Sequence, residues 1–241
     1  MEIKIDNAKY FGECVRAIAP LVDEANLKFS KEGLSVLSLD KTSVALVDFN
    51  MPSKAFSKYE VENESIGINI ENFNKIISRA RDGESLTINK PKDAKTKFTA
   101  IFTSGNSKRK YTINLIDVKE TKDIIPKVDA KIDIIGSELS NELNDAVSIS
   151  DFVTLSLSKS GFEVYAKGEI AEMQNECNPD KISEKEAKGT FNLEYLRAMI
   201  KGCDKDSTIN LTLANNEPLS IAYNIGEARL RFVLAPYMME A

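Results

Sequence analysis

The strongest constraint on this chain is an internal repeat. The ten residues from Ile68 to Ile77, INIENFNKII, return as FNLEYLRAMI from Phe191 to Ile200, without a gap and 123 positions later in a chain of 241 residues. Apolar positions match apolar ones, and in both copies the second residue is Asn and the fourth is Glu. Self-similarity at half the chain length predicts two similar domains in tandem.

Each half combines many short strand-like runs with two short helical stretches. The expected helices are 7–20, 71–81, 137–148 and 193–202. The expected strands are 2–5, 27–29, 34–39, 44–50, 65–68, 85–89, 97–102 and 111–115, then 130–135, 153–157, 162–166, 189–191, 208–213, 219–223 and 228–234. Turn residues separate these runs, so antiparallel pairing is expected. The pattern predicts an α+β fold with two helices in each domain.

A connector separates the halves. Residues 119–128, KETKDIIPKV, begin with charged side chains and contain Pro126, which cannot donate to a sheet. We expect an extended segment between an N-terminal domain, 1–118, and a C-terminal domain, 129–241. The two isoleucines before Pro126 have no purpose in a solvated linker, which predicts that they contact something.

Composition argues against an enzyme. The chain has no His, and it contains neither a GxxxxGK[ST] loop nor a GxGxxG loop. Carboxylates such as Asp23, Glu24, Asp204 and Asp206 have the pattern of turn and surface residues. No catalytic residue, metal site or cofactor is therefore predicted.

The cysteines and the apolar runs indicate an intracellular protein without a membrane partner. Cys14, Cys177 and Cys203 are odd in number and widely spaced, which is typical of reduced thiols. No apolar run approaches the ~18 residues of a membrane span, and the N-terminus, MEIKID, does not resemble a signal peptide.

Cations on the predicted helices stand out because the chain is acidic, with a net charge of −5. The charge is uneven: residues 1–118 carry +2 and residues 119–241 carry −7. Opposite the apolar faces of three helices lie Lys9, Arg16, Lys75, Arg79, Arg197 and Lys201. Such cations suit diffuse contact with phosphates, although an ordinary solvated face is the simpler interpretation for any single helix. The helix 137–148 has no cation.

Several short motifs, taken in order, resemble the archaeal and eukaryotic sliding clamps of the proliferating cell nuclear antigen (PCNA) family. They are Leu21-Val22-Asp23-Glu24-Ala25, Ser38-Leu39-Asp40 with Val44-Ala45-Leu46-Val47, Ile125-Pro126 and Leu234-Ala235-Pro236. The resemblance spans essentially the whole chain. It implies the DNA clamp fold, in which two similar α+β domains form a subunit and three subunits close into a ring around duplex DNA, with helices lining the hole.

The resemblance gives the cations and the subunit edges a meaning. The six helix cations would face the DNA, and the acidic third helix implies weaker contact on one side, because Asn141, Asn144 and Ser148 stand where relatives are commonly basic. The subunit interface would join strand 108–113 to strand 171–177. Its expected residues are Lys108, Arg109, Lys110, Tyr111, Ile113, Glu172, Met173, Gln174 and Glu176. The alternative is that Lys-Arg-Lys is a solvated loop end.

The resemblance also implies a pocket for a short hydrophobic and aromatic motif carried by partner enzymes. Its expected residues are Leu39, Val44, Leu46, Ile124, Ile125, Pro126, Pro218, Val233, Ala235 and Pro236. Recognition would combine anchors in a groove with strand addition at the C-terminal tail, and plain core packing is the alternative. Tyr237 departs from the family, where many relatives carry Lys or Arg.

We therefore predict a DNA sliding clamp, a processivity factor that assembles as a homotrimer around double-stranded DNA. Its partners would be DNA polymerase, a clamp loader, ligase and flap nuclease, and it would lie in the archaeal cytoplasm and nucleoid or in a eukaryotic nucleus. Two alternatives stay open: one subunit of a heterotrimeric clamp, suggested by the cation-free third helix, and a peptide-binding scaffold that does not encircle DNA.

Overall fold

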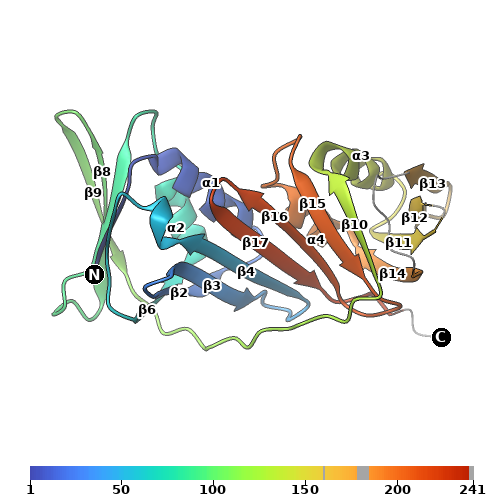
Figure 1. The fold of residues 1–241 in the computed structure, drawn as a ribbon, viewed down its shortest axis with the longest axis horizontal. Helices are drawn as coiled ribbons and strands as arrows, with labels where there is room; N and C mark the ends of the chain where they lie inside the picture. The colour runs from blue at the N-terminus through green and yellow to red at the C-terminus, as the bar shows by residue number, and fades with distance from the viewer. Residues whose placement is uncertain (160, 178–184, 239–241) are drawn as a thin grey trace. The chain divides into compact units, whose positions relative to one another are not determined.

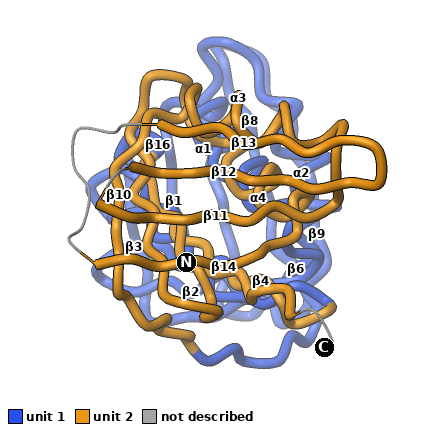
Figure 2. Tube along the Cα trace, turned by 90° about the vertical axis from the view of Figure 1, so that its right-hand side faces the viewer, with its two compact units in different colours: residues 1–41, 47–122, 225–230 blue, residues 42–46, 123–224, 231–241 orange. Residues whose placement is uncertain are grey.

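The computed structural model describes residues 1–159, 161–177 and 185–238, and the chain divides into two compact units (Figure 2). Unit 1 contains Met1–Lys41, Val47–Lys122 and Ile225–Leu230. Unit 2 contains Thr42–Leu46, Asp123–Asn224 and Arg231–Ala241. Each unit thus takes most of its residues from one half of the chain.

The helices and strands follow one another in the same pattern in both halves, except that the 3₁₀ turn η1 and strand β5 occur only among the described residues of the first half (Figure 1). The first half contains β1 (Glu2–Ile5), α1 (Ala8–Ile18), β2 (Glu24–Phe29), β3 (Gly33–Leu39), β4 (Ala45–Pro52), the 3₁₀ turn η1 (Ser53–Ala55), β5 (Lys58–Glu60), β6 (Glu64–Asn69), α2 (Ile70–Ile77), β7 (Ser85–Asn89), β8 (Lys97–Ser104) and β9 (Ser107–Asn114). The second half contains β10 (Ala130–Ile135), α3 (Gly136–Ala146), β11 (Phe152–Ser158), β12 (Gly161–Lys167), β13 (Glu172–Cys177), β14 (Ala187–Asn192), α4 (Leu193–Ile200), β15 (Thr208–Leu213), β16 (Leu219–Ile225) and β17 (Ala228–Leu234).

The sheets repeat the same strand order. The order β1-β7-β8-β9 in the first half corresponds to β10-β15-β16-β17 in the second, and β4-β3-β2-β6 corresponds to β13-β12-β11-β14. The pairings with a described register are antiparallel, for example Ile5 opposite Leu86 and Ile135 opposite Thr208. The predicted α+β fold with two helices in each half is confirmed.

Two strands of these sheets lack the apolar alternation that identifies the others. Strand β5 was not predicted, because its three residues show no such alternation; it pairs with β1 through Ile3 opposite Tyr59. Strand β13 was expected only from the family resemblance, since its sequence, EMQNEC, alternates exposed and half-buried side chains without an apolar face.

The identical residues of the repeat begin both second helices. The Asn69 side chain accepts a hydrogen bond from the Asn72 backbone N–H at 2.8 Å, and Asn192 accepts one from Tyr195 at 3.2 Å. Asn is a strong N-cap because it satisfies an orphan N–H group of the first turn. The repeated Glu lies in that first turn in both helices, where it complements the helix dipole.

Helix α2 ends earlier than the sequence predicted. Beyond Ile77 the bonds run from Arg79 N–H to the Ile76 carbonyl and from Ala80 N–H to the Ile77 carbonyl, at 3.2 and 3.0 Å, which is a tight turn instead of an α-helix. Gly83 then has φ +73° and reverses the chain into β7. The predicted helix 71–81 therefore consists of α2 followed by a turn that contains Arg79.

Each unit buries its own aromatic and aliphatic core between helices and sheets. In unit 1 the ring of Phe73 on α2 lies 6.3 Å from Phe11 on α1 and 6.0 Å from Phe98 on β8. In unit 2 Leu143 on α3 and Leu196 on α4 are fully buried. None of the described helices is long and apolar enough to cross a membrane.

Candidate functional site

The six predicted DNA-facing cations are all exposed on or just beyond helices. Two of them have a carboxylate partner in their own unit: Lys9 pairs with Asp82 at 2.6 Å, and Lys75 pairs with Glu71, one turn away, at 2.5 Å. Exposed pairs of this kind contribute about 0–1 kcal/mol. They leave the cations accessible but offset their charge locally.

Arg197 on α4 is held differently. Its Nε donates to the side-chain oxygen Oδ1 of Asn144 on α3, at 3.2 Å. Asn144 is one of the neutral residues that replaces an expected cation on the third helix. The contact brings α3 and the cationic face of α4 together, which the sequence did not predict.

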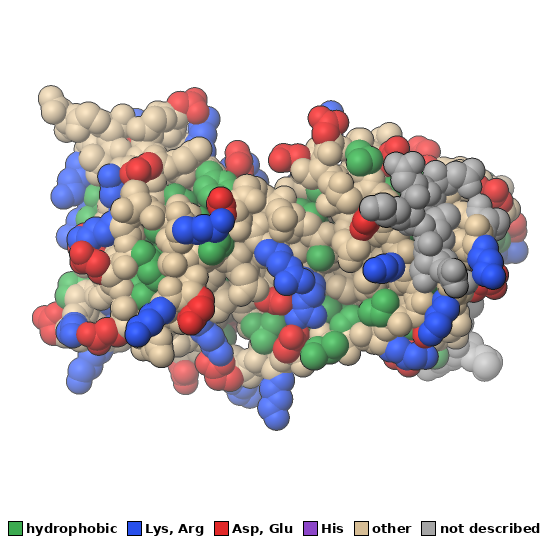
Figure 3. Space-filling model, viewed as in Figure 1, with side chains coloured by type: hydrophobic (Ala, Val, Ile, Leu, Met, Phe, Trp, Pro, Cys, Tyr) green, Lys and Arg blue, Asp and Glu red, His purple; other side chains and the backbone are tan. Residues whose placement is uncertain are grey.

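Charge of neither sign is concentrated on the face drawn in Figure 3. Figure 3 shows one face of the molecule, on which Lys and Arg side chains are interspersed with Asp and Glu. An anionic partner would find no broad basic surface there, in keeping with the net charge of −5.

The two strands predicted to form the subunit interface each lie at the end of a sheet. In the part of the chain that the structure describes, β9 pairs only with β8 and β13 pairs only with β12 (Figure 1). Both therefore present unpaired backbone N–H and C=O groups, which is the arrangement that another strand can extend. The assignment of these edges to an interface stays a prediction.

Alternation along β9 divides its predicted interface residues into two sets. Arg109, Tyr111 and Ile113 lie opposite Phe102, Ala100 and Phe98, whose side chains are buried in the core of unit 1. Lys108 and Lys110 lie on the other face of the sheet and are exposed. The run Lys-Arg-Lys therefore does not act as one basic patch.

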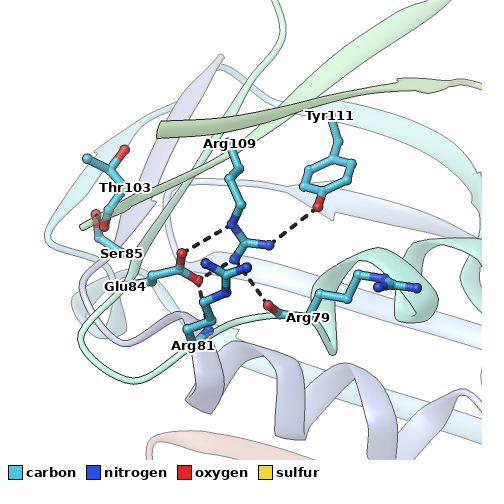
Figure 4. A network of polar contacts seen from close by, with 7 residues as sticks. All are labelled: Arg79, Arg81, Glu84, Ser85, Thr103, Arg109 and Tyr111. Carbon is cyan, nitrogen blue, oxygen red and sulfur yellow. Dashed lines mark hydrogen bonds and ion pairs between the residues drawn. The ribbon is translucent and has the colours of Figure 1, made fainter. Parts of the chain in front are cut away.

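Arg109 is the centre of a polar network inside unit 1 (Figure 4). Its guanidinium forms an ion pair with Glu84, whose side chain is only 4% exposed, through Nε at 3.2 Å and through Nη2. Nη2 also donates to the backbone carbonyl of Arg79 at 3.1 Å, and the guanidinium lies 4.8 Å from the centre of the Phe102 ring. Arg109 thus fastens the edge strand to the turn after α2.

Glu84 remains ionised despite its burial. Burial acts to raise the pKa of this carboxyl, but hydrogen bonds from Arg109 and from the Arg81 backbone N–H, together with the positive charge of both arginines, lower its pKa below the usual value. Sequence reasoning missed the pair. The signal was available only in the register, since Arg109 lies opposite an aromatic core residue.

The inward side chains of strand β13 contact their own unit through hydrogen bonds from neutral groups, without an ion pair like that of Arg109. Its inward side chains include Asn175, which donates to Glu142 on α3 at 2.6 Å, and Cys177, whose thiol lies 3.5 Å from the same carboxylate. Burial and the nearby Glu142 charge raise the pKa of Cys177 to about 11. The outward side chains carry Glu172, paired with Lys167 at 2.6 Å, and Gln174, which donates to Glu163 at 2.9 Å.

Most of the predicted partner pocket belongs to unit 2. Ile125 on the connector is 85% exposed, whereas Leu46 is 1% exposed and Val233 is 2% exposed. Val44, Pro126, Pro218, Ala235 and Pro236 are half-buried, Ile124 is exposed, and Leu39 is half-buried in unit 1. Leu46 and Val233 are therefore core residues, and Ile125 is the most exposed of the predicted pocket residues.

The connector and the tail are both fastened to β-structure within unit 2. Arg231 on β17 forms an ion pair with Asp123 and donates to the Ile124 carbonyl at 3.1 Å. The tail continues β17 with a bond from Ala235 N–H to the Val44 carbonyl at 2.8 Å. Beyond it, the Tyr237 ring stacks on Phe152 with centroids 3.9 Å apart, and its N–H donates to the Thr190 carbonyl.

The thiols and carboxylates to which the sequence gave no catalytic role have structural surroundings. Burial raises the pKa of Cys14 to about 12 and that of Cys203 to about 11. Asp23 pairs with Lys41 at 2.9 Å. Among the described residues no group of three or more His, Cys, Asp or Glu side chains is placed to hold a metal ion.

Comparison with known proteins covers the whole chain. Family models described as "Proliferating cell nuclear antigen, N-terminal domain" and "Proliferating cell nuclear antigen, C-terminal domain" match residues 1–124 and 125–238. The chain is 35% identical to DNA polymerase sliding clamp 1 of Thermococcus kodakarensis and 32% identical to the DNA polymerase sliding clamp of Pyrococcus furiosus, with 99% of each chain covered.

Two solved structures share the fold. One is PCNA from Thermococcus kodakaraensis, with a TM-score of 0.89, 22% identity and coverage of 98% of this chain and 99% of that one. The other is the C-terminal region of FEN-1 bound to A. fulgidus PCNA, with a TM-score of 0.89, 23% identity and coverage of 100% and 99%.

Proposed function

The chain belongs to the proliferating cell nuclear antigen family, and on that basis we propose that it is a DNA sliding clamp, without catalytic activity of its own, which encircles duplex DNA as a ring of three identical chains. In this role it tethers DNA polymerase and other replication and repair enzymes to the template. The clamp holds on topologically, because dissociation requires the ring to open instead of every phosphate contact to break.

The observation that best supports a ring is a correspondence between strands. The two edge strands, β9 and β13, occupy the same places in their sheets as two strands that pair with each other within this chain. By strand order, β9 in the first half corresponds to β17 in the second, and β13 corresponds to β4. Strands β17 and β4 are hydrogen-bonded neighbours. A second copy can therefore present β13 to β9 in the way that β4 meets β17.

This pairing is head-to-tail, so it produces a ring if the rotation between copies closes and a filament if it does not. Charge supports the match: outward on β9 are Lys108 and Lys110, and outward on β13 are Glu172 and Glu176. Opposite charges across paired strands contribute about 0.2–1 kcal/mol each. Unlike edges also discourage each edge from pairing with itself.

The DNA face of the ring would be formed by Lys9, Arg16, Lys75, Arg79, Arg197 and Lys201. All are exposed, and contacts from such cations to phosphate oxygens are weak, exchangeable and independent of base sequence. These are the properties that a sliding protein needs. The domains on either side of the connector 119–128 would be 1–118 and 129–241, each contributing helices to the hole.

Partner enzymes, including DNA polymerase, the clamp loader, ligase and flap nuclease, would bind at the predicted pocket through a short motif with apolar anchors. Ile125 supports this proposal because a side chain that is 85% exposed beside Pro126 is available to a ligand. The A. fulgidus PCNA structure was solved with the C-terminal region of FEN-1, and a clamp acting at the chromosome would work inside the cell, in the cytoplasm and nucleoid of an archaeon.

The first experiment is the solution mass of the purified chain by light scattering over a dilution series. A mass of three chains that persists on dilution is the expected result. A stable monomer would contradict the self-closing ring, and recovery of a trimer only after addition of a related chain would establish a heterotrimeric clamp.

Retention on DNA tests encirclement itself. A loaded ring is expected to stay on a closed circle and to slide off after one double-strand cut. Equal retention on the circle and the cut molecule would favour a scaffold that binds DNA or peptides without encircling DNA.

The pocket needs a separate test, because Leu46 is buried and its truncation would destabilise the fold by about 2–5 kcal/mol. Ile125→Ala alone is expected to weaken binding of a partner-motif peptide about tenfold, the size of a contact worth 1–2 kcal/mol, with unchanged unfolding. Val128→Ala is a matched control, since Val128 is also an exposed apolar residue of the connector. Equal affinity of Ile125→Ala and wild type would remove Ile125 from the pocket.

A further inference from the structure

The third helix presents an unexplained surface. Positions where a cation was expected carry Asn141, Asn144 and Ser148, and acidic residues lie among them. A helix that only weakened the grip on DNA would be a defect in a protein whose other helices carry cations. One of these three residues, however, contacts a cation of the neighbouring helix.

The contact has a defined polarity. Asn144 Oδ1 accepts from Arg197 Nε at 3.2 Å, while Asn144 Nδ2 donates to Ser140 Oγ at 3.4 Å. If the Asn144 amide were reversed, its NH₂ group would face the Nε–H donor of Arg197, and no hydrogen bond could form. The bond to Ser140 is compatible with the orientation that the Arg197 bond requires, because a hydroxyl oxygen can accept from the amide. Ser140 and Asn144 lie one helical turn apart on α3, which places both on the side of the helix that meets α4.

Arginine can be held at Nε and still bind phosphate. The guanidinium has five N–H donors in a planar fork, and the bond to Asn144 uses the Nε–H group. The four N–H groups on the terminal nitrogens are left for a bidentate contact with phosphate oxygens. Because Asn is neutral, the full positive charge of Arg197 also remains.

The lysines of unit 1 show the contrast. Lys9 and Lys75 are each held by a carboxylate, Asp82 and Glu71. A carboxylate fixes a cation but also offsets its charge toward an incoming phosphate. A neutral amide fixes the side chain without offsetting its charge, and immobilising a long side chain beforehand lowers the entropy cost of the later contact.

We propose that Asn144 is a positioning residue for DNA, which holds Arg197 with its terminal nitrogens free for a phosphate of the encircled duplex. The third helix then contributes to the DNA face without carrying a cation. This inference rests on the proposed function, because it assumes that Arg197 meets DNA.

The test is binding of the full-length clamp to a short labelled duplex by fluorescence anisotropy over a range of salt concentrations. Arg197→Ala is expected to reduce the slope of log affinity against log salt by about 0.9 for each phosphate that the variant no longer neutralises. Asn144→Ala is expected to reduce the slope in the same direction, and Asn144→Ala with Arg197→Ala should be no weaker than Arg197→Ala alone. Asn141→Ala is the matched control, an exposed Asn on the same helix, and should bind like wild type.

A second pair separates positioning from mere helix support. Asn144→Asp and Asn141→Asp add the same charge to the same helix, but only the first places it against Arg197. We expect Asn144→Asp to keep the fold, with unchanged thermal unfolding, and to lose more DNA affinity than Asn141→Asp.

Two results would overturn the inference. If Asn144→Ala binds like wild type while Arg197→Ala loses affinity, Arg197 needs no positioning. If Arg197→Ala itself leaves the salt slope unchanged, Arg197 does not meet phosphate and leaves the proposed DNA face. Neither result affects ring formation, which light scattering and retention on circular DNA test independently.

Discussion

The two edge strands, β9 and β13, occupy the same kind of position and are secured by different chemistry. Each ends a sheet, and each alternates between inward side chains that contact its own unit and outward side chains that are exposed. Inward on β9 is Arg109, in an ion pair with nearly buried Glu84. Inward on β13 are Asn175 and Cys177, hydrogen-bonded to half-buried Glu142.

The two edges show two ways in which a strand can stay ordered while its outer side is uncovered. An edge strand that must accept a partner cannot be covered, so its order has to come from its inward residues. On β9 this role takes up a positive charge, which leaves Lys108 and Lys110 as the cations available to another copy. On β13 the inward residues Asn175 and Cys177 are neutral, so both Glu172 and Glu176 lie on the exposed face, where Glu172 pairs with Lys167 of its own unit.

The largest effect is expected from breaking the β9 ion pair. Arg109→Met keeps much of the apolar stem but leaves the Glu84 carboxylate buried without its partner, which typically costs about 3–5 kcal/mol. Since the Arg109 side chain is 21% exposed, we expect the lower end, about 3 kcal/mol, by urea unfolding at fixed protein concentration.

Lys108→Met is the matched control for that substitution. It removes a neighbouring cation whose side chain is exposed on the other face, and should change the free energy of unfolding by less than about 0.5 kcal/mol. Equal costs for the two variants would mean that the ion pair does not secure the edge.

The next effect concerns the outward charges and ring assembly. Lys108→Glu with Lys110→Glu should place like charges across the β9–β13 pairing and weaken self-association by about 1–2 kcal/mol, about a five- to thirtyfold rise in the dissociation constant. Arg109 is left intact, because reversing all three residues would set a carboxylate beside Glu84 and unfold the edge.

Charge exchange provides the control. Glu172→Lys with Glu176→Lys should also weaken association alone, and should restore it when combined with the β9 pair of substitutions. Light scattering on dilution measures both. Failure of the four-residue exchange to recover the trimer would show that these strands do not face each other.

A smaller effect is expected at the inner face of β13. Asn175→Ala removes a hydrogen bond to a carboxylate that water can still reach, so the expected destabilisation is about 1 kcal/mol. Gln174→Ala, the adjacent outward residue, should lie within about 0.5 kcal/mol of wild type. A cost at Asn175 as large as that of Arg109→Met would remove the contrast between the edges.

The internal repeat predicted more of the fold than any single motif did. It located α2 and α4, and its invariant Asn69 and Asn192 are the N-caps of both helices. The register of β9 could not be predicted from the sequence, because only the pairing of Phe102 with Arg109 reveals that the arginine points inward. Burial could not be predicted either. Leu46 and Ile125 are similarly apolar residues, yet Leu46 is 1% exposed and Ile125 is 85% exposed.

The pH dependence of the β9 pair gives the last test of the contrast. The pKa of Glu84 is lowered in the folded protein, so its contribution to stability is present above the pKa of the unfolded carboxyl, about 4.3, and is lost as the pH falls through the lower folded value. In Arg109→Met the lowering interaction is gone while burial remains, so the pKa of Glu84 should rise.

The stability difference between wild type and Arg109→Met should therefore be largest near neutral pH and shrink toward pH 4, where the variant carries a neutral Glu84 and no longer holds an uncompensated charge. Urea unfolding over that range measures it, and Glu84→Gln with Arg109→Met is the control, expected to differ little from Arg109→Met once Glu84 is protonated. A difference that stays constant with pH would show that Arg109 supports the edge by packing on Phe102, which lies 4.8 Å below its guanidinium, and not by charge.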